Sequence, residues 1–329
     1  ATAGRAFWIL DDLATLQNIK TPKQEVSIFQ PKDTYLFMGG SSDKPVPGLG
    51  SNPKSGVTFD YYLIEKQDST ELKLEVIKDD EVIRTISNQK PKDFKSWPGG
   101  PSKPNVLPSK KGYNRFTWDF KRESLPAVDK VFVLGGHDGS TVGPGDYTLK
   151  ITLGTSTSET TVKILPNPKV KSSLADYAEQ QELLKTIEAA VVDMHNSVNS
   201  MRSAKAQLKY YAKLLKDNEK AESLLKQGDS LVKRITAWEE NLIQPNQKTF
   251  QDVINFENKL NAQLLNLRGY IDVVEPKVTA GAKVRLQDLL AQWGMFKTEQ
   301  NAIITTEMAT YNEAFRSLEI PALILSNKK

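Results

Sequence analysis

The side chains that could do acid–base or metal chemistry are few in this sequence. The chain has two histidines, His137 and His195, and no cysteine, which excludes disulfides, thiolate zinc ligands and cysteine nucleophiles. His195 lacks a second histidine one helical turn away, the usual helical metal pattern. His137 opens the sequence His-Asp-Gly-Ser, which has one carboxylate where a calcium loop needs several. We therefore predict no metal site, interpret His195 as a packed or surface residue, and keep His137 as a candidate ligand contact.

Motifs for covalent or hydrolytic catalysis are also missing. The sequence contains no Gly-x-Ser-x-Gly, so it offers no nucleophile elbow for a serine hydrolase. The adjacent acids at 11–12, 79–80 and 239–240 point to opposite faces or lie in turns, whereas glycoside hydrolysis needs two carboxylates that face each other. The segment 39–42, Gly-Gly-Ser-Ser, lacks the Lys-Ser/Thr and the helix of a phosphate-binding loop. The sequence therefore predicts no catalytic residue and no cofactor.

One aromatic residue stands among lysines in a loop. Trp97 lies between Lys95 and Lys103 in segment 90–111, where repeated proline and glycine exclude regular structure. An aromatic ring beside cations could contact a sugar or an anion. A loop of this kind more often buries its single large ring as an anchor. We favour the anchor and keep Trp97, Lys95 and Lys103 as candidate ligand contacts.

These residues sit in a region whose hydrophobic pattern predicts β-strands. In segment 114–120, Phe116, Trp118 and Phe120 alternate with polar residues, and Tyr147 begins a similar alternation after a Gly-Pro-Gly-Asp turn at 143–146. About seven strands are expected, the number of an immunoglobulin-like, fibronectin-III-like β-sandwich. Their predicted ranges are 57–64, 71–77, 82–86, 114–120, 131–134, 147–152 and 158–165. Asp79 and Asp80 predict the turn of a hairpin.

The first 55 residues show little periodicity. Segment 7–10, from Phe7 to Leu10, is apolar without alternation, as expected for a strand that is covered on both faces. We expect it to pair with a sheet outside this chain, or alternatively to tuck under the sandwich. Short strands are expected at 26–29 and 35–38, and a Gly/Ser/Pro-rich linker at 39–55.

After Pro168 the hydrophobic period changes from two to about 3.6, which is typical of helices. Ser173 and Asp176 form a capping box at the start of a helix that runs to about Leu215. Further helices are predicted over 218–243, 249–271 and 279–318. Short connections predict that consecutive helices are antiparallel neighbours, so this part should be an antiparallel bundle of about four helices.

Charge and composition exclude some partners and favour one location. The chain has 44 basic and 40 acidic residues, a net charge of +4, which predicts no nucleic-acid-binding face. It has no apolar run of the roughly 20 residues that span a bilayer. The absence of cysteine fits an extracytoplasmic protein. The chain starts at Ala1, and we interpret it as a piece of a larger protein rather than as one whose leader was removed.

Three segments together carry a family resemblance. They are 4–13 (Gly-Arg-Ala-Phe-Trp-Ile-Leu-Asp-Asp-Leu), the sandwich pattern of Asn114, Phe116, Trp118 and Asp119 followed by 143–148, and Asn-Lys-Leu at 258–260. The first resembles the stretch that ends the β-propeller of secreted, sortilin-like (BNR-type) bacterial proteins, often named glycosyl hydrolases and frequent in Bacteroidetes. The second is similar to the module that follows this propeller, and to Ig-like modules such as that of the flagellar hook-capping protein. The third resembles the family's helical C-terminal region. The resemblance implies that the propeller and any hydrolase-like site precede Ala1.

We therefore predict a β + α chain in three parts: a propeller-terminal strand and linker (1–55), an Ig-like sandwich (56–168) and a helical bundle (169–329). The predicted function is a non-catalytic interaction and scaffolding region, in the periplasm, at the cell surface or secreted. Its expected partners are the parent propeller, through Phe7 to Leu10, and a protein bound through the helices. The alternatives are an accessory region of a glycan-processing enzyme and a subunit of a cell-surface or secretion assembly.

Overall fold

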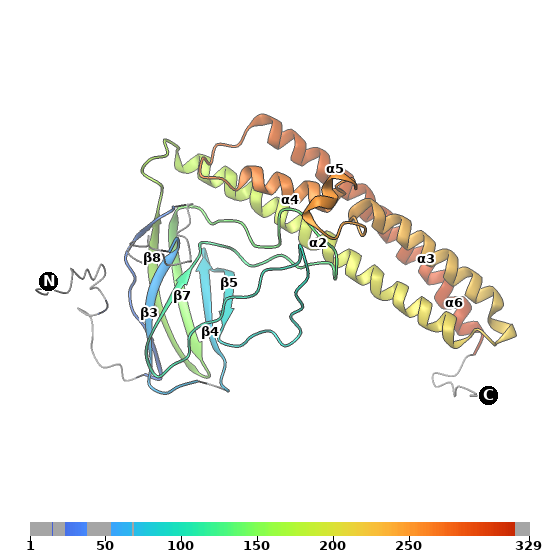
Figure 1. Ribbon diagram of the computed structural model, residues 1–329, viewed down its shortest axis with the longest axis horizontal. Helices are drawn as coiled ribbons and strands as arrows, with labels where there is room; N and C mark the ends of the chain where they lie inside the picture. Colours follow the sequence, from blue (N-terminus) through green and yellow to red (C-terminus); the bar gives the residue numbers. More distant parts are fainter. Residues whose placement is uncertain (1–14, 16–23, 38–53, 68, 320–329) are drawn as a thin grey trace, which may run out of the picture.

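The computed structural model describes residues 15, 24–37, 54–67 and 69–319 (Figure 1). Two β-sheets lie at one end, and the helices extend from them as a long arm. The β + α class predicted from the sequence is therefore confirmed. The predicted strand at 7–10 and most of the predicted linker at 39–55 lie outside the described residues.

The β-region consists of a three-stranded and a five-stranded sheet. The smaller sheet has the order β1 (Val26–Ile28), β3 (Val57–Leu63), β6 (Gly112–Trp118). The larger has the order β2 (Thr34–Tyr35), β8 (Ser156–Leu165), β7 (Gly145–Leu153), β4 (Leu72–Lys78), β5 (Glu81–Ser87). All pairs are antiparallel except β2 with β8.

The apolar side chains of the alternating segments pack into one hydrophobic core between the two sheets. Trp118 at the end of β6 is fully buried, and its ring centroid lies 5.5 Å from that of Tyr147 on β7 in the other sheet. Leu149, Ile151 and Leu153 continue the buried face of β7. The hairpin at Asp79 and Asp80 is confirmed, with positive φ at both residues, as a two-residue turn that follows the twist of its strands requires. Of the predicted turn at 143–146, only Pro144 is a bend, and Gly145 and Asp146 already belong to β7.

The predicted strand at 131–134 is wrong. This stretch is irregular, and Val131 and Val133 belong to the hydrophobic core of the helices. Polar side chains of the long helix α2 (Leu174–Leu214) satisfy the carbonyls of the loop that leads to it: Asn199 donates to Ala127 O at 2.9 Å, and Arg202 to Asp129 O at 2.9 Å. The run 131–134 is apolar because it packs into the helical core, and the loop 97–99 replaces the hydrogen bonds of a neighbouring strand: Val133 N donates to Gly99 O at 3.3 Å, and Val131 O accepts from Trp97 Nε1 at 2.8 Å.

The helices differ from the prediction at two points. The helix α2 begins at the predicted capping box of Ser173 and Asp176 and is followed by η1 (Glu219–Ala221) and α3 (Glu222–Leu242). The predicted third helix is split into a 3₁₀ turn, η2 (Phe250–Ile254), and α4 (Leu260–Ile271). The predicted fourth is α5 (Ala280–Ala302), a π-helical segment η3 (Ile303–Met308) and α6 (Ala309–Ser317).

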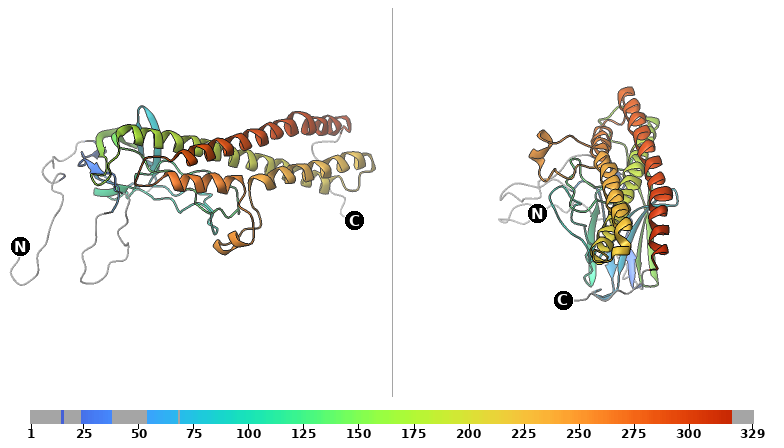
Figure 2. Two further views of the ribbon diagram at one scale, coloured as in Figure 1. Left: turned by 90° about the horizontal axis from the view of Figure 1, so that it is seen from above. Right: turned by 90° about the vertical axis from the view of Figure 1, so that its right-hand side faces the viewer.

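The second difference concerns their order in space, because α3 and α4 lie end to end. Glu239 of α3 contacts Arg202 of α2, and the Ile271 carbonyl at the end of α4 accepts from Gln180 near the start of α2. Both helices therefore run antiparallel to α2, in one row in Figure 2. The helix α5 runs parallel to α2. The predicted alternation of four antiparallel helices is wrong, because the connection 243–259 lets the chain continue in the same direction. None of the helices in the described part of the chain is both long and apolar enough to cross a membrane.

Candidate functional site: the junction between the sheets and the helices

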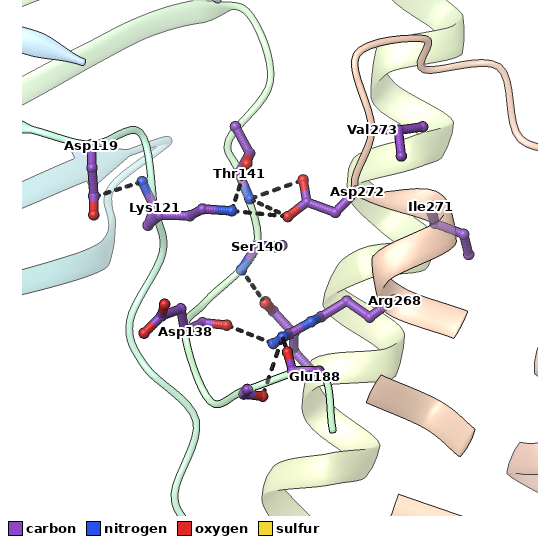
Figure 3. Close-up of polar contacts among 12 residues, drawn as sticks. Asp119, Lys121, Asp138, Ser140, Thr141, Glu188, Arg268, Ile271, Asp272 and Val273 are labelled. Atoms are coloured by element: carbon purple, nitrogen blue, oxygen red, sulfur yellow. Dashed lines mark hydrogen bonds and ion pairs between the residues drawn. The ribbon is translucent and has the colours of Figure 1, made fainter. Parts of the chain in front are cut away.

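The loop 119–142, which leaves the sheets, meets α2 and α4 in a polar, largely buried junction (Figure 3). Arg268 of α4 lies within this junction and is 6 % exposed. Its Nη1 donates to Asp138 O at 2.6 Å, and its Nη2 donates to the carbonyls of Gly135 at 2.9 Å and Gly136 at 3.3 Å. Burial lowers the pKa of Arg268, whereas the nearby carboxylate of Glu188 acts in the opposite direction. A guanidinium stays charged in proteins, so Arg268 is a cation within the junction.

The two carboxylates of the junction, Glu188 and Asp272, accept hydrogen bonds from the same loop. Glu188 of α2 is buried and accepts from Ser140 N at 2.5 Å. Asp272, which follows α4, accepts from Thr141 N at 3.1 Å and from Lys121 Nζ at 3.1 Å. These contacts join the sheet side of the molecule to two different helices (Figure 3).

The arrangement positions segments of the chain. Its cations and carboxylates are used by partners within the molecule, and each buried charge has a hydrogen-bonding partner, as burial requires. Buried ion pairs contribute little net stability, because desolvation offsets their attraction. Within the described residues, no group of three or more histidine, aspartate or glutamate side chains could hold a metal ion. The geometry is that of a fixed connection between two parts of the chain.

The structure brings the two histidines together beside this junction. Their ring centroids are 5.8 Å apart. His195 is fully buried, and its Nδ1 lies 2.7 Å from Pro126 O while its Nε2 lies 3.2 Å from the amide nitrogen of Asn261. This pattern fits a neutral ring that donates from Nδ1 and accepts at Nε2. Burial lowers the pKa of His195.

His137, the candidate ligand contact, is 1 % exposed, and neither of its ring nitrogens has a hydrogen-bond partner. Burial above all, then the neighbouring His195 and Arg268, lowers its pKa to about 4. The carboxylate of Asp138 acts in the opposite direction, as does the nearby backbone of Gly99, although it makes no hydrogen bond of normal geometry to the ring. His137 is therefore neutral at physiological pH.

The other candidate contacts lie in a loop that packs on the same region. Trp97 is partly buried, and its Nε1 donates to Val131 O at 2.8 Å. A Cβ on Gly100 would lie 2.6 Å from the Trp97 ring, so glycine lets the loop close over it. Lys95 and Lys103 are exposed at the surface of this loop. The loops of Trp97 and His137 are joined by this side-chain hydrogen bond of Trp97 and by a backbone hydrogen bond from Val133 N to Gly99 O at 3.3 Å.

A groove of about 500 Å³ opens beside the junction, between the sheets and the first turns of α2. It is lined by Arg122, by Lys78, Lys163 and Lys185, and by the loop 143–145. Sequence reasoning missed this groove and also Arg268, Glu188 and Asp272, because these residues are far apart along the chain and follow no local spacing.

The chain matches no protein-family model, and a search of curated proteins gave no match either.

Proposed function

We propose that this chain is a non-catalytic interaction and scaffolding region of a secreted, sortilin-like propeller protein. In this proposal the two sheets form an immunoglobulin-like sandwich and the helices form a bundle that presents a docking face. One contact supports the sandwich in particular: the hydroxyl of Tyr147 donates to Gly143 O at 2.6 Å. Immunoglobulin-like domains have a comparable tyrosine corner, in which a tyrosine bonds to the backbone a few residues upstream.

The observation that carries the scaffolding proposal is the junction of Arg268, Glu188, Asp272 and Lys121. Buried charges that are matched within the molecule hold segments in one arrangement, and a mismatched arrangement would leave a charge unpaired. The junction therefore favours a fixed orientation of the helical arm on the sheets. A fixed arm suits a protein that holds a partner at a set distance.

Two partners are expected. The apolar segment from Phe7 to Leu10 would pair with the parent propeller. The helical arm carries exposed apolar side chains on two helices, Tyr210 (62 % exposed) and Met295 (64 %), that a protein partner could cover. An extracytoplasmic location is part of the proposal.

The intact mass of the native protein tests the first part, because it shows whether a propeller is attached to, cleaved from or absent from this chain. If the propeller is cleaved or separately made, it should bind the chain, and a variant lacking residues 1–12 should not. A native protein with no propeller at all would overturn the proposal.

Three further assays separate the alternatives. Stable co-purification with a membrane-associated complex would favour a subunit of a cell-surface or secretion assembly. Specific glycan-array binding by the chain would favour an accessory region of a glycan-processing enzyme. Turnover of any substrate by the chain alone would overturn the non-catalytic role.

A further inference from the structure

The groove beside the junction has the size and lining of a ligand site. Its volume of about 500 Å³ falls within the range of small-molecule pockets, about 300–1,000 Å³. Four cations line it, Lys78, Arg122, Lys163 and Lys185, against two lining carboxylates, Asp79 and Glu182. They come from β4, from the loop 119–142, from β8 and from α2, so the fold converges basic groups from four segments on one place.

Arg122 is the cation in this groove that lacks an acidic partner. Among the carboxylates of the described residues, none lies within ion-pair distance of its guanidinium. Its Nη2 donates to the neutral amide oxygen of Gln181 at 2.9 Å, and its Nε is buried without any partner. Leaving a donor of a charged group unpaired in a buried position costs free energy, which a matching anion would recover.

Arg115 in the same chain shows that the Nε and Nη2 atoms of a guanidinium can bind one carboxylate together. Its Nε and its Nη2 donate to the two carboxylate oxygens of Asp60, at 2.7 and 2.8 Å. On the same edge of Arg122, Nη2 bonds to the Gln181 amide and Nε has no partner. Gln181 itself lines the groove, and its Nε2 donates to Thr141 O at 3.0 Å. A ligand that reaches the Nε–Nη2 edge of Arg122 must therefore displace the Gln181 side chain and replace its hydrogen bond to Arg122.

The lysines of the groove form only long ion pairs with carboxylates, and Lys78 also donates from Nζ to Asp146 O at 3.2 Å and lies over the Tyr147 ring. Lys78 lies 3.7 Å from Asp79, Lys163 lies 3.8 Å from Asp146, and Lys185 lies 3.5 Å from Glu81. The carboxylates of Asp79, Asp146 and Glu81 in these pairs, and that of the lining residue Glu182, are all exposed. Exposed pairs of this kind contribute little, so a ligand anion can compete for the lysines at small cost.

Part of the lining is apolar, which narrows the class of ligand. Leu165, Pro166 and Ala178 line the groove beside the charged groups, as does Leu174, which is 70 % exposed. A small inorganic anion would leave this surface uncovered. A ligand with a carboxylate next to an apolar group would match both parts.

We infer that this groove binds a ligand that carries a carboxylate next to an apolar group, and that Arg122 pairs with the carboxylate through Nε and Nη2. This site is independent of the proposed scaffolding function. The carboxylate can come from a free organic acid or from the C-terminal residue of a peptide, which offer the same chemistry.

Binding to the full chain is measured by isothermal titration calorimetry with two matched probe pairs. The first pair is 4-phenylbutyrate and its neutral amide, and the second is the peptide acetyl-Ala-Ala-Leu with a free or an amidated C-terminus. Each acid should bind about tenfold or more tightly than its amide. The pair with the higher affinity identifies the source of the carboxylate. Equal affinity of acid and amide in both pairs, or no binding of any probe, would overturn the inference.

Variants then test the assigned residues. Arg122→Gln should weaken binding of the acid about tenfold or more, and Arg122→Lys should weaken it too, because lysine keeps the charge but cannot form the bidentate pair. Lys150→Gln removes a cation of β7 that does not line the groove, and it should leave the affinity unchanged. Asp79→Asn should raise the affinity by removing a like charge from the rim.

Fold integrity is followed by far-UV circular dichroism and melting temperature. If Arg122→Gln unfolds the chain, backbone amide NMR of the unaltered protein replaces it. Addition of the acid should then shift the amide signals of Gly143, Gly145 and Gln181. If these signals do not shift, the acid does not bind in this groove. Undiminished binding by a folded Arg122→Gln variant would do the same.

Discussion

Replacing His137 with leucine should stabilise the protein at neutral pH and remove part of its sensitivity to acid. The imidazole is 1 % exposed, and both of its nitrogens lack hydrogen-bond partners. A buried unpaired polar group costs about 1–3 kcal/mol. Leucine has a similar volume and no polar atom, so His137→Leu should raise the free energy of unfolding at pH 7.5 by about 1–2 kcal/mol.

The pH dependence follows from the lowered pKa of His137. Its ordinary value is 6.5, and in the folded protein it falls to about 4, so between these values the unfolded chain binds more protons than the folded chain. Stability is therefore complete above about pH 6.5 and declines as the pH falls toward 4. For this one group the loss from pH 7.5 to pH 5.0 amounts to about 2 kcal/mol. The variant should not show this part of the loss.

Urea unfolding at pH 7.5 and pH 5.0, followed by circular dichroism at 222 nm, measures both effects. His195→Leu is the matched control, because the partners of its ring, Pro126 O and Asn261, would be left unpaired. We expect that variant to be destabilised by about 2–4 kcal/mol at both pH values. If His137→Leu is also destabilised at pH 7.5, or if it loses as much stability at pH 5.0 as the unaltered chain, the ring of His137 has partners and the reasoning fails.

The remaining predictions concern three other contacts. Trp97→Phe keeps an aromatic ring but loses the hydrogen bond to Val131 O, so we expect the free energy of unfolding in urea to fall by about 1 kcal/mol. An unchanged unfolding midpoint would argue against an anchoring role. Arg268→Met should destabilise the chain by about 3–5 kcal/mol and loosen the helical arm, which small-angle X-ray scattering would detect as a wider distance distribution. Asp60→Asn should lower stability at pH 7 more than at pH 3. Burial raises the pKa of Asp60, but the hydrogen bonds from Arg115 and Thr15 outweigh burial and lower the pKa. The stability that the charged carboxylate provides is therefore lost as the pH falls through that lowered value. A variant that is equally destabilised at both pH values would contradict this.

Much of the local structure could be predicted from the sequence. Alternation in 114–118 and 147–153 defines β6 and β7, because a strand buried on one face must alternate. The two aspartates at 79–80 predict the hairpin, and the capping box at Ser173 predicts the start of α2. The candidates Trp97 and His137 were also visible as single residues, since large rings and histidines stand out against their neighbours.

The tertiary structure decided what covers each apolar segment. The run 131–134 has the composition of a buried strand, but α2 covers it, and only the fold shows which partner supplies its hydrogen bonds. The direction of α4 likewise depends on how the connection 243–259 folds, which the helical period does not record.

The same reason applies to the polar contacts. Arg268 meets the carbonyls of a loop about 130 residues earlier in the chain, and the pairing of His137 with His195 spans two separate elements. Arg122 is one of many basic residues in the sequence, and only its place between the sheets and α2 leaves it without a carboxylate partner among the described residues. A local pattern tells which face of an element is buried, because burial selects apolar side chains; it carries no information on what distant segment lies against that face.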